Sequence, residues 1–389
     1  MNMAGKPKVV VFCDHLLYPS ETFIQAQASA LREFEPVFAG SRRVPGLELP
    51  QEKVYLVNRG GPFAKFHELR FKIWGSAPAL SKELEALRPI LLHAHFGPNG
   101  LRVLPLARRL SLPLITTFHG SDIAITDWRY EKVYLGFRYY LAKKAKLRAS
   151  SATFLAVSNF VQRKLLEQGF PEDRTFLAYT GVDTTKFRPA STEDRPIILF
   201  VGRLVGFKGP EFAIRAASEV QRELPDVELV LIGDGLLRRE LEALARQSLR
   251  RFRFLGVQTH QEVSAWMNRA SLLCMPSVTM PSGDAEGFGM VCAEAQAVGK
   301  PVVAFKSGGI AEIIRHDKTG FMAPERDWHS LARYLATLLK NREIRQRFGR
   351  AGREVIVREF NLDQCTRRLE GIYRRVSGTE TAFNEENRW

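Results

Sequence analysis

Short apolar runs recur along the chain and alternate with longer stretches in which apolar residues return every three or four positions. The runs lie near residues 8–13, 54–57, 90–94, 113–117 and 153–157, and again near 197–201, 227–232, 252–256, 271–275 and 301–304. Runs that are apolar on both sides of a strand are typical of parallel sheets covered by helices. The pattern therefore predicts an α/β protein with two doubly wound halves.

A polar, turn-rich stretch, residues 181–195, separates the two series of strands. Such a stretch between two apolar runs is typical of a linker between domains. After residue 340 the periodicity predicts two helices, near 342–359 and 362–376, and a frayed tail from Gly378 to Trp389. We therefore divide the chain into residues 1–185, 186–360 and a terminal piece, 361–389.

The composition is that of a globular protein of two domains, with 389 residues, of which 45% are hydrophobic and 25% charged. No apolar run approaches the roughly 18 to 20 residues that a membrane span needs. The first residues lead directly into the strand near 8–13, so we expect a cytoplasmic protein. The cysteines form no CxxC pair, which predicts reduced thiols at Cys13, Cys274, Cys292 and Cys365.

Two glutamates flank an apolar helix start in the stretch Glu286-Gly-Phe-Gly-Met-Val-Cys-Ala-Glu294. The two glycines between them let a ligand approach the backbone, and the amides of residues 288–290 would direct the positive end of a helix at a phosphate. Glu294 lies about two turns beyond Glu286, so one carboxylate can reach a transferred sugar and the other a ribose diol. A dipole partner and a solvated helix residue would have the same spacing.

Two basic residues favour the ligand site over that alternative. The buried strand near 197–201 ends in a turn, and Arg203 and Lys208 follow it. A guanidinium fork and an ammonium charge at the carboxyl end of a strand suit a pyrophosphate.

With these residues in place, the sequence resembles the retaining glycosyltransferases of GT-B fold, family 4, which build bacterial exopolysaccharide, lipopolysaccharide and glycolipids. The resemblance covers nearly the whole chain and also includes Phe118-His-Gly-Ser-Asp122, Thr180-Gly-Val-Asp183, Gly233-Asp-Gly235, Phe254-Leu-Gly256 and Ser307-Gly-Gly-Ile-Ala-Glu312. It implies two Rossmann-like domains that face a cleft, with the first binding the acceptor and the second the nucleotide sugar. It also implies a last helix that crosses back onto the first domain.

The resemblance implies transfer of a hexosyl unit from a UDP- or GDP-linked sugar to a hydroxyl of a saccharide or lipid-linked saccharide, with retained configuration. The catalytic residues we expect are His119, Glu286, Arg203 and Lys208. The donor-binding residues we expect are Arg203, Lys208, Gly235, Gln258, Glu286, Phe288, Gly289, Met290 and Glu294. The acceptor-binding residues we expect are Ser20, Glu21, Thr22, His95 and Asp122.

His119 follows the predicted strand near 113–117, and the matching histidine of the family lies beside the anomeric carbon. A structural hydrogen-bonding role suits a lone histidine after a strand as well. His93-Ala-His95 would place two imidazoles on one strand face, but no third ligand is evident from spacing, and the sequence has no Asp-x-Asp motif. We expect no metal and no cofactor; Arg203 and Lys208 would neutralise the departing diphosphate instead.

The net charge is +15, and residues 1–190 carry about +11 of it. Aromatic and basic residues interleave in segments 65–74 and 128–148, as they do in helices that lie on anionic lipid. This leaves open a peripheral association with the inner face of the plasma membrane. An ordinary amphipathic helix with a solvated basic side fits the same pattern. Nucleic acid is not an expected partner, because no finger, recognition-helix or RNP-like motif accompanies the charge.

The loop after the first strand departs from the family, many of whose members carry a Gly-Gly turn there. It contains His15-Leu-Leu-Tyr-Pro-Ser-Glu-Thr-Phe23, which resembles the colanic-acid-type exopolysaccharide subgroup, and we expect Ser20 to cap the following helix. Two alternatives stay open: a sugar-nucleotide epimerase of the same fold and a non-catalytic partner subunit. A NAD- or ATP-dependent enzyme is disfavoured, because neither G-x-G-x-x-G nor G-x-x-x-x-G-K-[ST] occurs.

Overall fold

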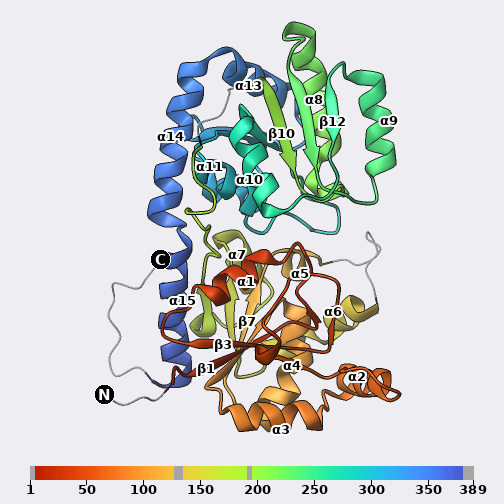
Figure 1. Ribbon diagram of the computed structural model, residues 1–389, viewed down its shortest axis with the longest axis vertical. Coiled ribbons are helices and arrows are strands. Elements are labelled where there is room, and N and C mark those ends of the chain that lie inside the picture. The colour runs from red at the N-terminus through yellow and green to blue at the C-terminus, as the bar shows by residue number, and fades with distance from the viewer. Residues whose placement is uncertain (1–4, 127–134, 191–194, 380–389) are drawn as a thin grey trace. The chain divides into compact units, whose positions relative to one another are not determined.

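The computed structural model describes residues 5–126, 135–190 and 195–379. The chain divides into two compact units, one formed by Met1–Gly181 with Leu362–Trp389 and the other by Val182–Asn361 (Figure 1). Each unit is built on one parallel sheet with helices against it, so the predicted pair of doubly wound halves is confirmed. The assignment of acceptor and donor binding to the separate domains stays a prediction.

The first unit holds a seven-stranded sheet in the order β5-β3-β1-β6-β7-β8-β9. Its strands are β1 (Lys8–Phe12), β3 (Glu35–Gly40), β5 (Val54–Leu56), β6 (Leu91–His95), β7 (Leu114–Phe118), β8 (Thr153–Ala156) and β9 (Thr175–Leu177). A short parallel pair, β2 (His15–Leu16) and β4 (Arg42–Arg43), extends beyond β1 and β3. The sheet is covered on both faces: every residue of β6, β7 and β8 is buried.

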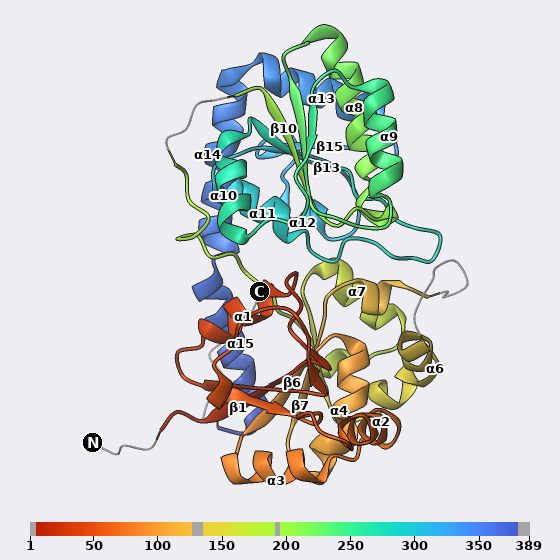
Figure 2. The ribbon, with the colours of Figure 1, turned by 45° about the vertical axis from the view of Figure 1, so that its right-hand side comes forward.

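Helices cover this sheet in two groups. They are α1 (Thr22–Ser29), α2 (Ala64–Trp74), α3 (Pro78–Leu87), α4 (Gly97–Arg109), α5 (Ser121–Ala124), α6 (Leu135–Arg148), α7 (Asn159–Glu167) and α15 (Leu362–Ser377). α4 packs on β6 and β7, and both α2 and α6 pack on α4. α15 packs on α1 and β6, and both views show it alongside α1 (Figures 1 and 2).

The return of the last helix to the first unit is confirmed, and specific contacts hold it there. Glu370 accepts hydrogen bonds from the amides of Arg32 and Glu33, each at 2.7 Å. Tyr373 is buried in the core cluster of that unit and bonds to His93. The helix therefore completes the hydrophobic core of the first unit.

The second unit holds a six-stranded parallel sheet in the order β12-β11-β10-β13-β14-β15. Its strands are β10 (Ile197–Val201), β11 (Glu228–Ile232), β12 (Phe252–Phe254), β13 (Leu272–Met275), β14 (Val302–Phe305) and β15 (Gly320–Ala323). Its helices are α8 (Pro210–Glu223), α9 (Arg238–Ser248), α10 (His260–Arg269), α11 (Met290–Ala297), α12 (Ile310–Ile313), α13 (Trp328–Lys340) and α14 (Arg342–Glu359). Of these, α10, α13 and α14 begin at side-chain caps from Thr259, Asp327 and Asn341.

The structure departs from the sequence predictions in five strands and one helix cap. β2, β3, β4, β9 and β15 were not predicted, because β2 and β4 have two residues each, β3 begins with Glu35 and Pro36, β9 has three residues, and β15 begins with a glycine. The expected Ser20 cap is wrong: Glu21 occupies the N-cap position of α1, and no side chain caps that helix. Within the described ranges, no helix has both the length and the apolar character to cross a bilayer.

Candidate functional site

An ion pair links the two halves of the predicted donor site in the second unit. Lys208 lies in a single 3-10 turn, Gly206–Lys208, after β10, and its Nζ pairs with Oε2 of Glu286. Both side chains are largely buried, with 14% and 12% of their surfaces exposed. The Phe207 ring lies 5.5 Å from the Arg203 guanidinium and 5.3 Å from the Lys208 ammonium. The structure thus gathers two cations and one carboxylate near the carboxyl end of β10.

Glycines let two loops approach each other beside Glu286. The amide of Gly309 donates a 2.9 Å hydrogen bond to the carbonyl oxygen of Glu286. A Cβ on Gly309 would overlap the carbonyl oxygen of Gly287, and one on Gly308 would overlap that of Glu286. Only glycine fits this close approach of the two backbones.

Helix α11 begins immediately after Glu286-Gly-Phe-Gly, as predicted. Its N-cap is Gly289, whose φ of 91° belongs to the left-handed region that favours glycine. Phe288 is buried, and Met290 is the first residue of the helix. The amides of residues 288–290 therefore lie at the positive end of α11.

Glu294 lies inside α11 and is 8% exposed. Its burial raises the pKa of the carboxyl group to about 8, and the nearby Lys208 lowers that pKa by a smaller amount. The carboxyl group is therefore mostly protonated at neutral pH, and it can donate one hydrogen bond and accept another.

Two further predicted donor residues lie in loops after β11 and β12. Gly235 packs against the backbone of Leu204, where a Cβ would come within 2.5 Å of the carbonyl oxygen. The side-chain nitrogen Nε2 of Gln258 donates hydrogen bonds to the carbonyl oxygens of Leu255 and Val257, at 2.9 and 3.2 Å. The Gln258 side chain therefore shapes its own loop.

In the first unit, three histidines stack at the carboxyl ends of β6 and β7. Nδ1 of His95 lies 3.1 Å from Nε2 of His119, and the two rings stack with centroids 5.3 Å apart. His93 lies on the other side of His95, at 4.4 Å between centroids, and bonds to Tyr373 and Thr117 at 2.6 Å each. The sequence placed His93 and His95 on one strand face but gave no sign that His119 joins them.

Burial keeps these histidines neutral. It lowers the pKa of His95 to about 3 and the pKa values of His93 and His119 well below the ordinary value. His95 is 2% exposed, so it is placed to hold His119. Across the described ranges, no group of three or more His, Cys, Asp or Glu side chains is arranged to hold a metal ion.

Asp122 organises the backbone around His119. One carboxylate oxygen accepts from the amides of His119 and Gly120, at 3.0 and 2.9 Å, and the other from Gly97 at 2.9 Å. Burial raises the pKa of Asp122 to about 6, while hydrogen bonds from backbone amides oppose that shift. The carboxylate thus ties the start of α4 to the loop after β7. Its contact with an acceptor stays a prediction.

The loop before α1 holds the other predicted acceptor residues. Ser20 is exposed, Thr22 is the first residue of α1, and Glu21 accepts a 2.9 Å hydrogen bond from the amide of Tyr18. Burial raises the pKa of Glu21 to about 7. At neutral pH this carboxyl group is therefore divided between its protonated and ionised forms.

Asp14, a buried carboxylate just after β1, was not among the predicted site residues. It pairs with Arg102 of α4 and with the hydroxyl of Ser41, and Lys72 of α2 lies 3.8 Å away. A polar residue directly after a buried strand was a usable signal, but the partners come from three distant segments. Asp14 thus links α2 and α4 to the carboxyl end of β1, near which three of the predicted acceptor-binding residues lie in sequence.

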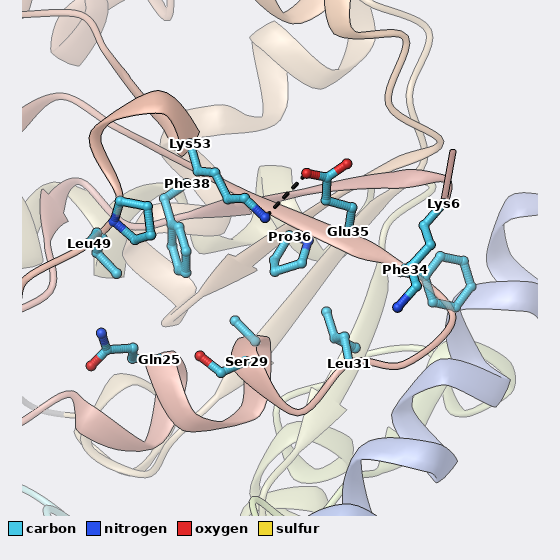
Figure 3. Close-up of a pocket in the computed structure, with 12 residues that line it drawn as sticks. Lys6, Gln25, Ser29, Leu31, Phe34, Glu35, Pro36, Phe38, Leu49 and Lys53 are labelled. Carbon is cyan, nitrogen blue, oxygen red and sulfur yellow. Dashed lines mark ion pairs between the residues drawn. The ribbon is translucent and has the colours of Figure 1, made fainter. Parts of the chain in front are cut away.

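A pocket of about 500 Å³ lies elsewhere in the first unit, between α1 and β3 (Figure 3). Apolar side chains such as Leu31, Phe38 and Leu49 line it, and Lys53 pairs with Glu35 at 3.2 Å on its rim. None of the predicted substrate-binding residues lines this pocket. This pocket is therefore separate from the candidate site.

Comparison with known proteins identifies the family. Residues 20–186 match the model of Glycosyltransferase Family 4, and residues 182–355 that of Glycosyl transferases group 1. The chain is 31% identical over 289 residues to the putative colanic acid biosynthesis glycosyltransferase WcaL of Escherichia coli (72% of this chain, 69% of the relative). It is 30% identical over 297 residues to the amylovoran biosynthesis glycosyltransferase AmsK of Erwinia amylovora (73% and 69%).

Among solved structures, HepE of Anabaena in complex with UDP-glucose has a TM-score of 0.76 at 19% identity and covers 95% of this chain and 99% of its own. This likeness confirms the expected fold. The chain therefore belongs to the glycosyltransferases of family 4, with the GT-B fold, and is homologous to the colanic acid and amylovoran biosynthesis glycosyltransferases.

Proposed function

We propose that this protein transfers a hexosyl unit from a nucleoside-diphosphate sugar, UDP- or GDP-linked, to a hydroxyl of a saccharide or lipid-linked saccharide, with retained configuration and without a metal ion. The observation that carries the proposal is the Lys208–Glu286 pair beside Arg203 and the glycine-lined loops. The complex of HepE with UDP-glucose supports testing UDP first.

On this proposal the donor diphosphate lies against Arg203, Lys208 and the start of α11. Breaking the glycosidic bond leaves negative charge on the diphosphate, and fixed cations and amides stabilise it without having to reorganise. Lys208 is already held by Glu286, which gives its ammonium a fixed position before the donor arrives. Glu286 then binds hydroxyls of the transferred sugar.

The remaining roles follow from protonation states. Glu294, protonated at neutral pH, donates to one ribose hydroxyl and accepts from the other. His119 is neutral, so it offers the sugar a hydrogen bond without adding positive charge beside a developing oxocarbenium ion. Glu21, Thr22 and Ser20 contact the acceptor.

The acceptor side includes an electrostatic proposal. The basic residues of segments 65–74 and 128–148 attract an anionic membrane surface that carries the acceptor, and the protein works at the cytoplasmic face. Residues 128–134 lie outside the described part of the chain; α6 supplies exposed Arg138, Lys143 and Lys146 from the rest.

The first test is thermal stabilisation by UDP, GDP and their sugar conjugates in the presence of a chelator. A ligand at a hundredfold excess over its Kd stabilises the folded state by about 2.7 kcal/mol. Lys208→Ala should remove the shift. Lys340→Ala, which breaks the pair between Lys340 of α13 and Glu223 of α8 in the same unit, should keep it.

Turnover and product NMR complete the test. Transfer with the donor's anomeric configuration supports the proposal, whereas interconversion of the free donor without transfer identifies an epimerase. A protein that binds no nucleotide with or without acceptor is a non-catalytic subunit.

A further inference from the structure

The outer face of α2 carries the largest gathering of exposed apolar side chains in the described part of the chain. Phe63, Phe66, Leu69, Ile73 and Trp74 are 69%, 57%, 55%, 51% and 66% exposed. Elsewhere in the described ranges, large apolar side chains are exposed singly or, on α6, as the pair Leu135 and Tyr139. Contiguous exposed apolar surface on a folded unit marks an interaction site.

The spacing makes these residues a stripe. They recur at intervals of three and four positions from Phe63 to Ile73, with Trp74 beside the last, so they share one side of the helix. The opposite side is buried: Ala64, Glu68 and Phe71 face the unit, and Phe71 packs edge-on against Phe12 of β1. Folding of the unit therefore uses the inner side of α2 and leaves the apolar stripe unused.

The inner side also holds α2 firmly. Glu68 accepts a 2.8 Å hydrogen bond from Asn58 and pairs with Lys72, whose Nζ lies 3.8 Å from Asp14. The helix ends at Gly75, which adopts a left-handed conformation and packs against Pro105. The stripe is thus presented on a fixed support.

The charge around the stripe indicates the kind of partner that it fits. Lys65 is exposed on α2, and Lys143, Lys146 and Arg138 are exposed on α6. α2 and α6 both pack on α4, and both views place them on that side of the sheet (Figures 1 and 2). An apolar stripe with basic neighbours on a unit of high positive charge complements an anionic bilayer, which offers acyl chains and phosphates together.

We propose that α2 docks this protein on an anionic bilayer by burying Phe66, Leu69 and Ile73 in the boundary between headgroups and acyl chains, with Phe63 and Trp74 at the two ends of the stripe. This inference deepens the proposed function, since it names the surface from which a lipid-linked acceptor is reached. Unlike attraction by lysines alone, apolar insertion persists when salt screens the charges.

The test is flotation of the full-length protein with vesicles of mixed phosphatidylglycerol and phosphatidylcholine, at low and high salt. Phe66→Ser/Ile73→Ser should lower vesicle partitioning by about tenfold or more at both salt concentrations, because two apolar side chains are removed from the boundary between headgroups and acyl chains. Lys65→Glu should weaken binding mainly at low salt. Leu166→Ser/Val357→Ser removes two exposed apolar residues from α7 and α14 and should change nothing.

Unfolding temperature and nucleotide-induced stabilisation are measured on every variant, so that misfolding is recognised. Vesicle binding of the Phe66/Ile73 variant at the wild-type level overturns the proposal. The proposal is also overturned if the wild-type protein is a dimer that binds no vesicles and the Phe66/Ile73 variant is a monomer. That result would assign the stripe to contact with a second copy of the chain. If the wild-type protein binds vesicles but no nucleotide, the result counts against the proposed function and not against docking through α2.

Discussion

Replacing Lys208 by methionine separates the structural from the chemical role of the Lys208–Glu286 pair. The substitution leaves the Glu286 carboxylate, 12% exposed, without its cation. Removing one partner of a fully buried pair costs about 3–5 kcal/mol, and the remaining exposure of both groups reduces this to about 2–3 kcal/mol. For a unit of this size that corresponds to a fall of roughly 5–10 °C in Tm.

The matched variant is Lys208→Met/Glu286→Gln, which removes both charges. It should recover most of the lost stability, because no unpaired charge remains, but none of the nucleotide binding. Urea unfolding gives the stability of both variants, and thermal shift with UDP and GDP gives their binding. Unchanged stability of Lys208→Met would contradict the stabilising role of the ion pair. Wild-type nucleotide affinity of the double variant would contradict a role of Lys208 and Glu286 in donor binding.

Three further outcomes are expected. Gly309→Ala should destabilise the protein by about 1–3 kcal/mol and abolish nucleotide binding, because the added Cβ overlaps the backbone oxygen of Gly287. Urea unfolding measures the stability and thermal shift measures the binding; no change in either would contradict the loop geometry. His95→Gln should lower kcat about tenfold with the donor Kd unchanged, since it releases His119 from its 3.1 Å contact; an equal loss of donor affinity would argue against that role. The three buried histidines should contribute less stability as pH drops below about 6.5, because they take up protons only on unfolding, whereas Glu294, Glu21 and Asp122 should contribute less as pH rises, because the unfolded state ionises them first. The two effects oppose each other between about pH 4.5 and 6.5, so the fall in stability from about pH 6.5 towards 8 is the slope to measure, and Glu294→Gln should reduce it in urea titrations.

The central strands could be predicted because they are buried on both faces and leave uninterrupted apolar runs. The strands that escaped lack such a run, and β3 shows the reason: Glu35 and Pro36 interrupt its pattern, yet it pairs with β1 along its first five residues. Tertiary pairing, which a local pattern does not contain, makes it a strand.

The candidate site divides in the same way. Glu286, Gly289 and Glu294 are close in sequence, so their relation to a helix start followed from spacing alone. The bond between His95 and His119, and the pairing of Asp14 with Arg102, join segments that lie far apart in the chain. Such contacts depend on strand order, which the apolar runs do not determine.

The place of α15 in the first unit has a consequence during synthesis. About 180 residues, Val182–Asn361, separate the body of that unit from its last helix. At roughly 5–20 residues per second, the ribosome needs on the order of 10–35 seconds to add them. During that interval Val9 and Leu91 lack the packing of Tyr373, and His93 lacks its hydrogen bond to it. The core of the first unit is therefore completed only after the second unit has been synthesised. A released chain that ends at Asn361 should accordingly present an open core of the first unit to chaperones, although it contains every residue of the second unit.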